Sequence, residues 1–202
     1  MADVAVIDSG GANLASLRYA LQRLGASAQV TTDFARIERA SHVLLPGVGA
    51  AFDAMSRLKA AGLADRIGTL RQPVLGICLG MQLLFESSAE AESGQSATPC
   101  LGVLPGHVAR LTADADHPVP HMGWNSLEIL QPDPLLAGFG SQDYMYFVHS
   151  YVAPQSAVTL AVADYGRKVP AVVRRDNFRG VQFHPERSAR AGARLLANFL
   201  AL

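Results

Sequence analysis

The sequence is short of cysteine, of long apolar runs and of net charge, and each shortage excludes a class of protein. Two cysteines in 202 residues cannot form a disulfide framework, so we expect free thiols and a cytoplasmic location. Lysine plus arginine and aspartate plus glutamate both number 17, which leaves no global field to attract nucleic acid or an anionic membrane. No run approaches membrane-spanning length, and the opening MADVAVID lacks the features of a secretion signal.

Apolar residues make up 50% of the chain, which is enough for one substantial core. We expect a single domain over residues 1–202, without repeats or a linker. In the first half, apolar runs at 4–7 and 43–45 alternate with helical patterns at 14–24, 51–61 and 79–86. This alternation predicts an α/β fold with an open, mostly parallel sheet and helices on both of its faces.

The second half has shorter apolar runs, and we expect them to add antiparallel strands to the sheet. These runs lie at 106–111, 126–130, 144–148, 158–163, 170–174 and 180–183. Leu195, Leu196 and Phe199 give a closing helix an apolar face that would cover the sheet. Between the halves, the small and polar residues 87–99 predict a mobile surface loop.

Cys78 ends the apolar run PVLGIC, lies between Gly76 and Gly80, and precedes a helical pattern that begins at MQLLF. This order resembles a nucleophile elbow, in which a tight turn displays the reactive side chain at the edge of the sheet. The start of the following helix would also favour a thiolate. The alternative is a buried apolar side chain, as many free cysteines are. Cys100 is not flanked by glycines on both sides and has no helical pattern after it, and we expect an inert thiol there.

A cysteine nucleophile needs a base and usually a third group that orients the base. His184 ends the apolar run GVQF, and Glu186 follows two positions later. Because catalytic groups of open α/β sheets gather at the carboxyl ends of strands, His184 would meet Cys78 there. The alternative is a satisfied surface histidine beside a solvated glutamate. His149 in YFVHSY also lies at a strand end, where it would contact substrate rather than act as the base.

The glycine-rich PGVG at 46–49 follows an apolar run and would turn backbone amides toward a pocket. The amides of Val48 or its neighbour Gly49, together with that of Leu79 after the nucleophile, would bind a tetrahedral oxyanion. A plain turn between a strand and a helix is the alternative. The histidines and cysteines have no spacing typical of zinc sites, so we expect no metal and no cofactor.

Taken together, PGVG at 46–49, GICLGMQ at 76–82 and GVQFHPE at 180–186 resemble the class I, triad-type glutamine amidotransferases. PHMGWN at 120–125 and YFVHSY at 146–151 narrow the resemblance to the glutaminase subunits of imidazole glycerol phosphate synthase. The resemblance runs nearly end to end. It implies a Cys78-His184-Glu186 enzyme of histidine biosynthesis that hydrolyses glutamine and passes ammonia to a (βα)₈-barrel cyclase in a heterodimer.

The resemblance also implies roles for other residues. Gln82, His149 and Ser150 match positions near the bound glutamine. Positions near the subunit interface are matched by Asn13, Trp124, Tyr146 and Arg187. Many relatives carry lysine in place of Arg187, which changes the hydrogen-bond geometry of any ion pair at the interface. Two alternatives remain open, a γ-glutamyl hydrolase that works without a partner and a regulatory subunit whose triad is unused.

Overall fold

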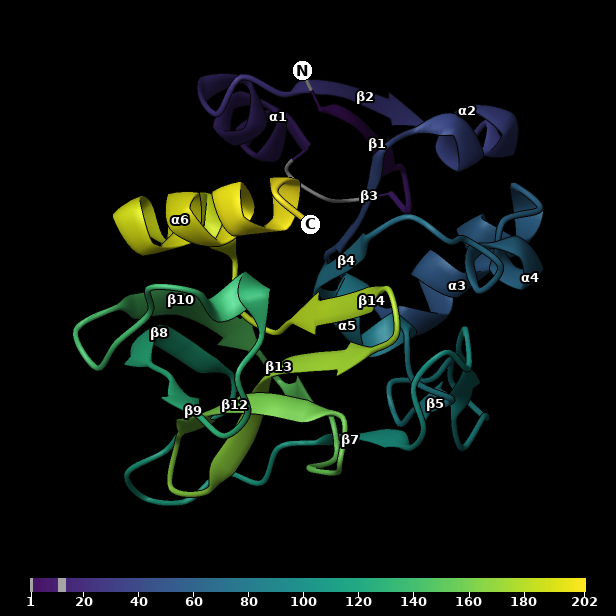
Figure 1. The fold of residues 1–202 in the computed structure, drawn as a ribbon. Helices are drawn as coiled ribbons and strands as arrows, with labels where there is room; N and C mark the ends of the chain where they lie inside the picture. Colours follow the sequence, from purple (N-terminus) through teal and green to yellow (C-terminus); the bar gives the residue numbers. More distant parts are fainter. Residues whose placement is uncertain (1, 11–13) are drawn as a thin grey trace.

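The computed structural model describes residues 2–10 and 14–202, and its central feature is an eight-stranded sheet (Figure 1). The strand order is β2-β1-β3-β4-β14-β13-β12-β9. In that order the strands span Ser27–Thr31, Asp3–Ile7, His42–Gly47, Val74–Cys78, Phe178–Val181, Lys168–Arg175, Thr159–Asp164 and Glu128–Ile129. Pairing is parallel from β2 to β14 and antiparallel from β14 to β9. The predicted parallel sheet with antiparallel additions is confirmed.

Helices cover both faces of this sheet, as predicted. Figure 1 shows α1 and α6 together on one side and α2, α3 and α4 on the other. The helices are α1 (Leu14–Arg23), α2 (Phe34–Arg39), α3 (Ala51–Ala60), α4 (Ala64–Ile67), α5 (Leu79–Leu83) and α6 (Ala189–Leu200). The central strands are mostly apolar because successive side chains point to opposite, covered faces. In β1, Val4 and Val6 pack with α1 and α6, whereas Ala5 and Ile7 pack with α2 and α3.

Two smaller sheets flank the main one. The strands β8 (His121–Ser126) and β10 (Tyr144–His149) pair into an antiparallel ribbon. A four-stranded sheet has the order β11-β7-β5-β6, with bounds Tyr151–Val152, His107–Arg110, Ser87–Ser88 and Thr98–Pro99. The ends of the predicted polar loop at 87–99 are therefore strands, and Ser88 and Thr98 are buried. The prediction of a surface loop was wrong at those ends because β6 pairs with β5, which in turn pairs with β7.

The order of the strands brings the predicted motifs together. β4 lies between β3 and β14, and all three run parallel, so their carboxyl ends meet at one edge. The segments that leave this edge are 48–49 after β3, Leu79 after β4, and 182–184 after β14. This is the edge at which open α/β sheets place their ligands.

Some boundaries differ from the sequence predictions. The helix predicted for 79–86 is α5, which ends at Leu83. Gly25 lies just after α1 with a φ of 77°, a left-handed conformation that is common for glycine at the end of a helix. Within the described residues, no helix is long and apolar enough to cross a membrane.

Candidate active site

Cys78 lies at the turn between β4 and α5 with a φ of 54° and a ψ of −112°. Few residues other than glycine adopt a positive φ, so the surrounding structure must hold this conformation. Gly80 allows it, because a Cβ at that position would collide with the carbonyl oxygen of Leu45 in β3. Gly76 is needed too, since its Cβ would lie 2.7 Å from the carbonyl oxygen of Gly80. The two glycines therefore let β4 turn sharply and turn Cys78 out of the sheet.

His184 and Glu186 form a hydrogen-bonded pair across the carboxyl end of β14. Nδ1 of His184 lies 2.8 Å from Oε1 of Glu186, and the two side chains are only 8% and 10% exposed. The backbone of His184 is fixed as well, because its N–H donates to Tyr146 and its carbonyl accepts from the Ser188 hydroxyl. Glu186 lies in a 3₁₀ turn, η2 (Pro185–Arg187), which directs its carboxylate back toward the ring. The sequence prediction that Glu186 orients His184 agrees with this geometry.

The electrostatics favour a charged imidazole. Burial by itself lowers the pKa of His184, but its interactions with Cys78 and Glu186 raise that pKa to about 10. Cys78 acts on this pKa first through hydrogen bonding and then through its charge, although within the described residues Nε2 of His184 has no partner within hydrogen-bond distance. An imidazolium beside a sulfur is the arrangement that stabilises a thiolate.

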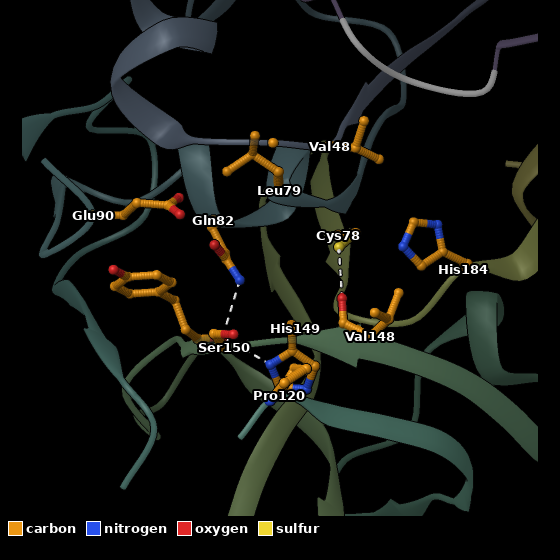
Figure 2. Close-up of a pocket in the computed structure, with 12 residues that line it drawn as sticks. Val48, Cys78, Leu79, Gln82, Glu90, Pro120, Val148, His149, Ser150 and His184 are labelled. Atoms are coloured by element: carbon orange, nitrogen blue, oxygen red, sulfur yellow. Dashed lines mark hydrogen bonds between the residues drawn. The ribbon is translucent and has the colours of Figure 1, made fainter. Parts of the chain in front are cut away.

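The two groups open into one cavity of about 330 Å³ (Figure 2). Figure 2 shows the sulfur of Cys78 beside the ring of His184, with Gln82 and Glu90 farther along the cavity. Eight of the residues predicted from sequence line it: Val48, Gly49, Cys78, Leu79, Gln82, His149, Ser150 and His184. Gly49 has a φ of 89°, a conformation that suits a loop whose amides turn toward a ligand.

Hydrogen bonds within the protein limit what two of these residues can offer a ligand. Nδ1 of His149 donates to the carbonyl of Tyr151 at 2.8 Å, and its Nε2 lies 3.0 Å from Nδ1 of His121. Burial, the larger effect, and nearby histidines lower the pKa of His149 to about 3 despite the Tyr151 bond. His149 is therefore neutral and has both ring nitrogens occupied. Gln82 likewise uses its NH₂ within the protein, which leaves its carbonyl oxygen for a ligand.

A protein-family model described as glutamine amidotransferase class-I matches residues 5–202. The chain belongs to this family. It is 52% identical over 202 residues to the imidazole glycerol phosphate synthase subunit HisH of Xanthomonas axonopodis pv. citri, covering 100% of this chain and 98% of that one. The HisH subunit of Xylella fastidiosa is 50% identical with the same coverage. These identities place the amidotransferase in the HisH subunit family.

Solved structures agree with the fold. A crystal structure of a glutamine amidotransferase superimposes with a TM-score of 0.73 at 24% identity, covering 98% of this chain and 97% of that one. The crystal structure of a putative GMP synthase component from Thermoplasma acidophilum also gives 0.73, at 17% identity, with 100% and 93% covered. At such identities the match shows that the sheet and its covering helices are those of the amidotransferases.

The structure adds site residues of this amidotransferase that the sequence did not indicate. Glu90 lines the cavity, and its Oε2 accepts from the amide of Ala51 at the start of α3. Burial, partly offset by that hydrogen bond, raises the pKa of Glu90, and the charge of Asp53 adds to the shift. The residue lies in the segment predicted to be a loop, where nothing in the local sequence marks it as functional. Pro120 and Tyr151 line the cavity as well.

Three of the four predicted interface residues lie together beside the amidotransferase site. The rings of Trp124 and Tyr146 meet edge to face with centroids 5.8 Å apart. The guanidinium of Arg187 lies 4.5 Å from the centroid of Tyr146, and within the described residues it forms no ion pair with a carboxylate. Arginine in place of lysine therefore stacks on an aromatic face. Asn13, the fourth, lies outside the described residues.

Proposed function

We propose that this chain is the glutaminase subunit of an imidazole glycerol phosphate synthase. Its ammonia would pass to a (βα)₈-barrel cyclase that makes imidazole glycerol phosphate and an aminoimidazole carboxamide ribonucleotide in histidine biosynthesis. One observation supports this proposal most directly. Cys78, at a turn with a positive φ, shares a cavity with His184, and Nδ1 of His184 is hydrogen-bonded to the carboxylate of Glu186. The name of the relatives, a synthase subunit, supports the pathway and the need for a partner.

The arrangement supports acyl transfer through a thioester. Transfer of the Cys78 proton to Nε2 of His184 gives a thiolate, which attacks the side-chain carbonyl carbon of glutamine. The C–N bond breaks, the imidazolium gives its proton to the departing NH₂, and ammonia leaves a γ-glutamyl thioester. His184 then takes a proton from water as it attacks the thioester, which releases glutamate and restores the thiol. The amides of Val48 or Gly49 and of Leu79 would stabilise the oxyanion in both steps.

Charges and hydrogen-bonding groups in the cavity fit the rest of glutamine. Glu90 is the single carboxylate among the described lining residues, and it suits the α-ammonium group. The free carbonyl oxygen of Gln82 can accept one N–H from the substrate, and Ser150 lines the same cavity. His149 would contact the ligand through its ring face or backbone, because its nitrogens are occupied. A Glu90→Gln variant should raise the KM for glutamine much more than it lowers kcat.

The partner would dock over Trp124, Tyr146 and Arg187. The proposal includes Asn13 on sequence grounds alone.

Both cysteines are free thiols, which is consistent with a proposed cytoplasmic location. The single sheet that joins the two halves is consistent with one domain over residues 1–202.

The test is glutamine hydrolysis by the chain, alone and with the cyclase and its nucleotide ligand. Cys78→Ala should abolish glutamine-dependent synthesis and leave synthesis from added ammonium intact, whereas the matched control Cys100→Ala should keep both.

We expect the chain alone to hydrolyse glutamine slowly, because the glycine-rich 46–49 loop can rest without one oxyanion donor. Full activity without a partner would instead indicate a stand-alone γ-glutamyl hydrolase. A Cys78 that reacts no faster than ordinary thiols with a glutamine-like electrophile would indicate an unused triad.

A further inference from the structure

Gln182 contacts the reacting sulfur but has no part in the three-residue mechanism. It directly follows β14, its side chain is fully buried, and its Nε2 lies 3.7 Å from Sγ of Cys78. Its backbone N–H donates to Ala171 on β13, so the main chain is held by the sheet at this point. The side chain is therefore aimed at the sulfur from a rigid position.

The orientation of the Gln182 amide follows from its neighbours. The carbonyl of Tyr151 can only accept, so the group of Gln82 that faces it at 3.0 Å must be the NH₂. The second hydrogen of that NH₂ points to Gln182 at 2.9 Å, where it requires an acceptor. The oxygen of Gln182 must therefore face Gln82, and its NH₂ must face Cys78. A flipped amide would set two NH₂ groups against each other.

The sulfur thus has two polar neighbours with opposite preferences. The carbonyl of Val148, 3.8 Å away, can bind only the protonated thiol, which has a hydrogen to donate. The N–H of Gln182 can bind the thiolate, which accepts strongly. When the S–H proton moves to His184, the contact with Val148 loses its hydrogen and the contact with Gln182 strengthens.

We propose that Gln182 is a further catalytic residue, whose side-chain N–H stabilises the Cys78 thiolate and holds it for attack. This inference rests on the proposed role of Cys78 as the nucleophile. The same chain of amides connects the sulfur to the substrate, because Gln82 both lines the cavity and donates to Gln182. Hydrogen bonds in such a chain polarise one another, so a ligand on Gln82 alters the donor strength of Gln182.

The experiment measures the rate of Cys78 alkylation by iodoacetamide against pH, with the Cys78 peptide followed by mass spectrometry. Cys100 interferes little, because burial raises the pKa of its thiol to about 11. In Gln182→Met, which keeps the length of the side chain without a donor, the midpoint of the pH profile should rise by about one unit. With the cyclase present, kcat for glutamine should fall about tenfold with little change in KM.

A second variant keeps the test decisive if the first fails to fold. Gln182→Glu retains an oxygen for the NH₂ of Gln82 and sets a carboxylate oxygen against the sulfur, so its midpoint should rise further. The matched control is Gln72→Met, which removes a side-chain amide that donates to Ile37 outside the site and should leave the midpoint unchanged. Folded Gln182 variants with the wild-type profile would overturn the inference, as would unfolding of both, since Gln182 would then serve the fold.

These outcomes are separate from those of the proposed function. Alkylation requires no turnover, so a wild-type chain that lacks glutaminase activity even with the cyclase and its nucleotide ligand would overturn the function, while the pH profiles would still decide the role of Gln182.

Discussion

His184 depends on two neighbours for its charge, which makes it the residue whose titration reports most directly on the site. Glu186→Gln keeps an oxygen for Nδ1 and therefore the ring orientation, but removes the negative charge. The pKa of His184, raised to about 10 in the wild type, should fall. A drop of about one to three units is typical for loss of an opposite charge at this range. Titration of the His184 ring by NMR would measure it.

The sign of the activity change follows from that fall. In the proposed mechanism the protonated ring is the acid that releases ammonia, and a lower pKa confines this form to lower pH. The variant should therefore hydrolyse glutamine more slowly, with its optimum displaced toward acid. His42 on β3 serves as the internal control, because its ring contacts Phe199 away from the site. An unchanged His184 titration in Glu186→Gln would mean that the carboxylate does not charge the ring.

At the residue scale, the site residues that belong to short motifs could be predicted from the sequence. The site residues that reach the cavity only through the fold were missed. Cys78, His184 and Glu186 follow from local order, since a strand end, a turn and glycines can be recognised within a few residues. Glu90 is 12 positions beyond Cys78 in a polar segment, and it is held at the cavity by contacts with distant residues, such as the hydrogen bond from the amide of Ala51. His121 was also missed, because its contact is with His149 on the neighbouring strand.

Asp133 forms hydrogen bonds with three separate elements of the fold. Its buried carboxylate accepts from Arg179 on β14 through both oxygens, from Arg174 on β13, and from the amide of Leu135. Leu135 belongs to the 3₁₀ turn η1 (Pro134–Leu136), which packs against α6. Burial on its own would raise the pKa of Asp133, but the hydrogen bonds and charges of Arg179 and Arg174, with the amide, lower it overall.

Asp133→Asn should destabilise the fold by about 3 kcal/mol, because it leaves a buried arginine without its counter-charge. The folded pKa of Asp133 lies below its unfolded value, so its stabilisation is complete above about pH 4 and is lost as pH falls through the folded pKa. Urea unfolding at several pH values should show a weaker acid dependence in the variant. Asp164→Asn, in an exposed pair with Lys168, should match the wild type. Equal effects of the two substitutions would contradict the argument.

Elements were predictable where packing and periodicity agree. The buried strands β1, β3 and β4 and the amphipathic helices α1, α3 and α6 match their predicted positions. β8 was missed because only Met122 and Trp124 alternate in HMGWNS, and between them lies Gly123, which has a φ of 137°. β2 was missed for a related reason, since it is an edge strand without a fully buried residue. Both form because a neighbouring strand supplies hydrogen bonds, which no local pattern encodes.

At the scale of the whole molecule, one apolar surface stands next to the catalytic cavity. Register in the β8/β10 ribbon puts Trp124 opposite Tyr146 and Met122 opposite Val148 on its outer face. Met122 and Trp124 are 63% and 53% exposed, and Val148 also lines the cavity. Exposed aromatic side chains that rim a functional cavity are typical of an interface with another protein. The outer face therefore suits the proposed cyclase partner.

Trp124→Ala should weaken binding of the cyclase at least about tenfold, since tryptophans at the centre of an interface contribute strongly. Its exposure in the free chain means that folding should be nearly unaffected. Leu130→Ala is the matched control, because Leu130 is also exposed, at 42%, but follows β9 at the far edge of the main sheet. Calorimetric titration with the cyclase would compare the two affinities. Stimulated glutaminase activity of Trp124→Ala should recover at saturating cyclase if the residue serves docking, whereas equal binding by both variants would place the interface elsewhere.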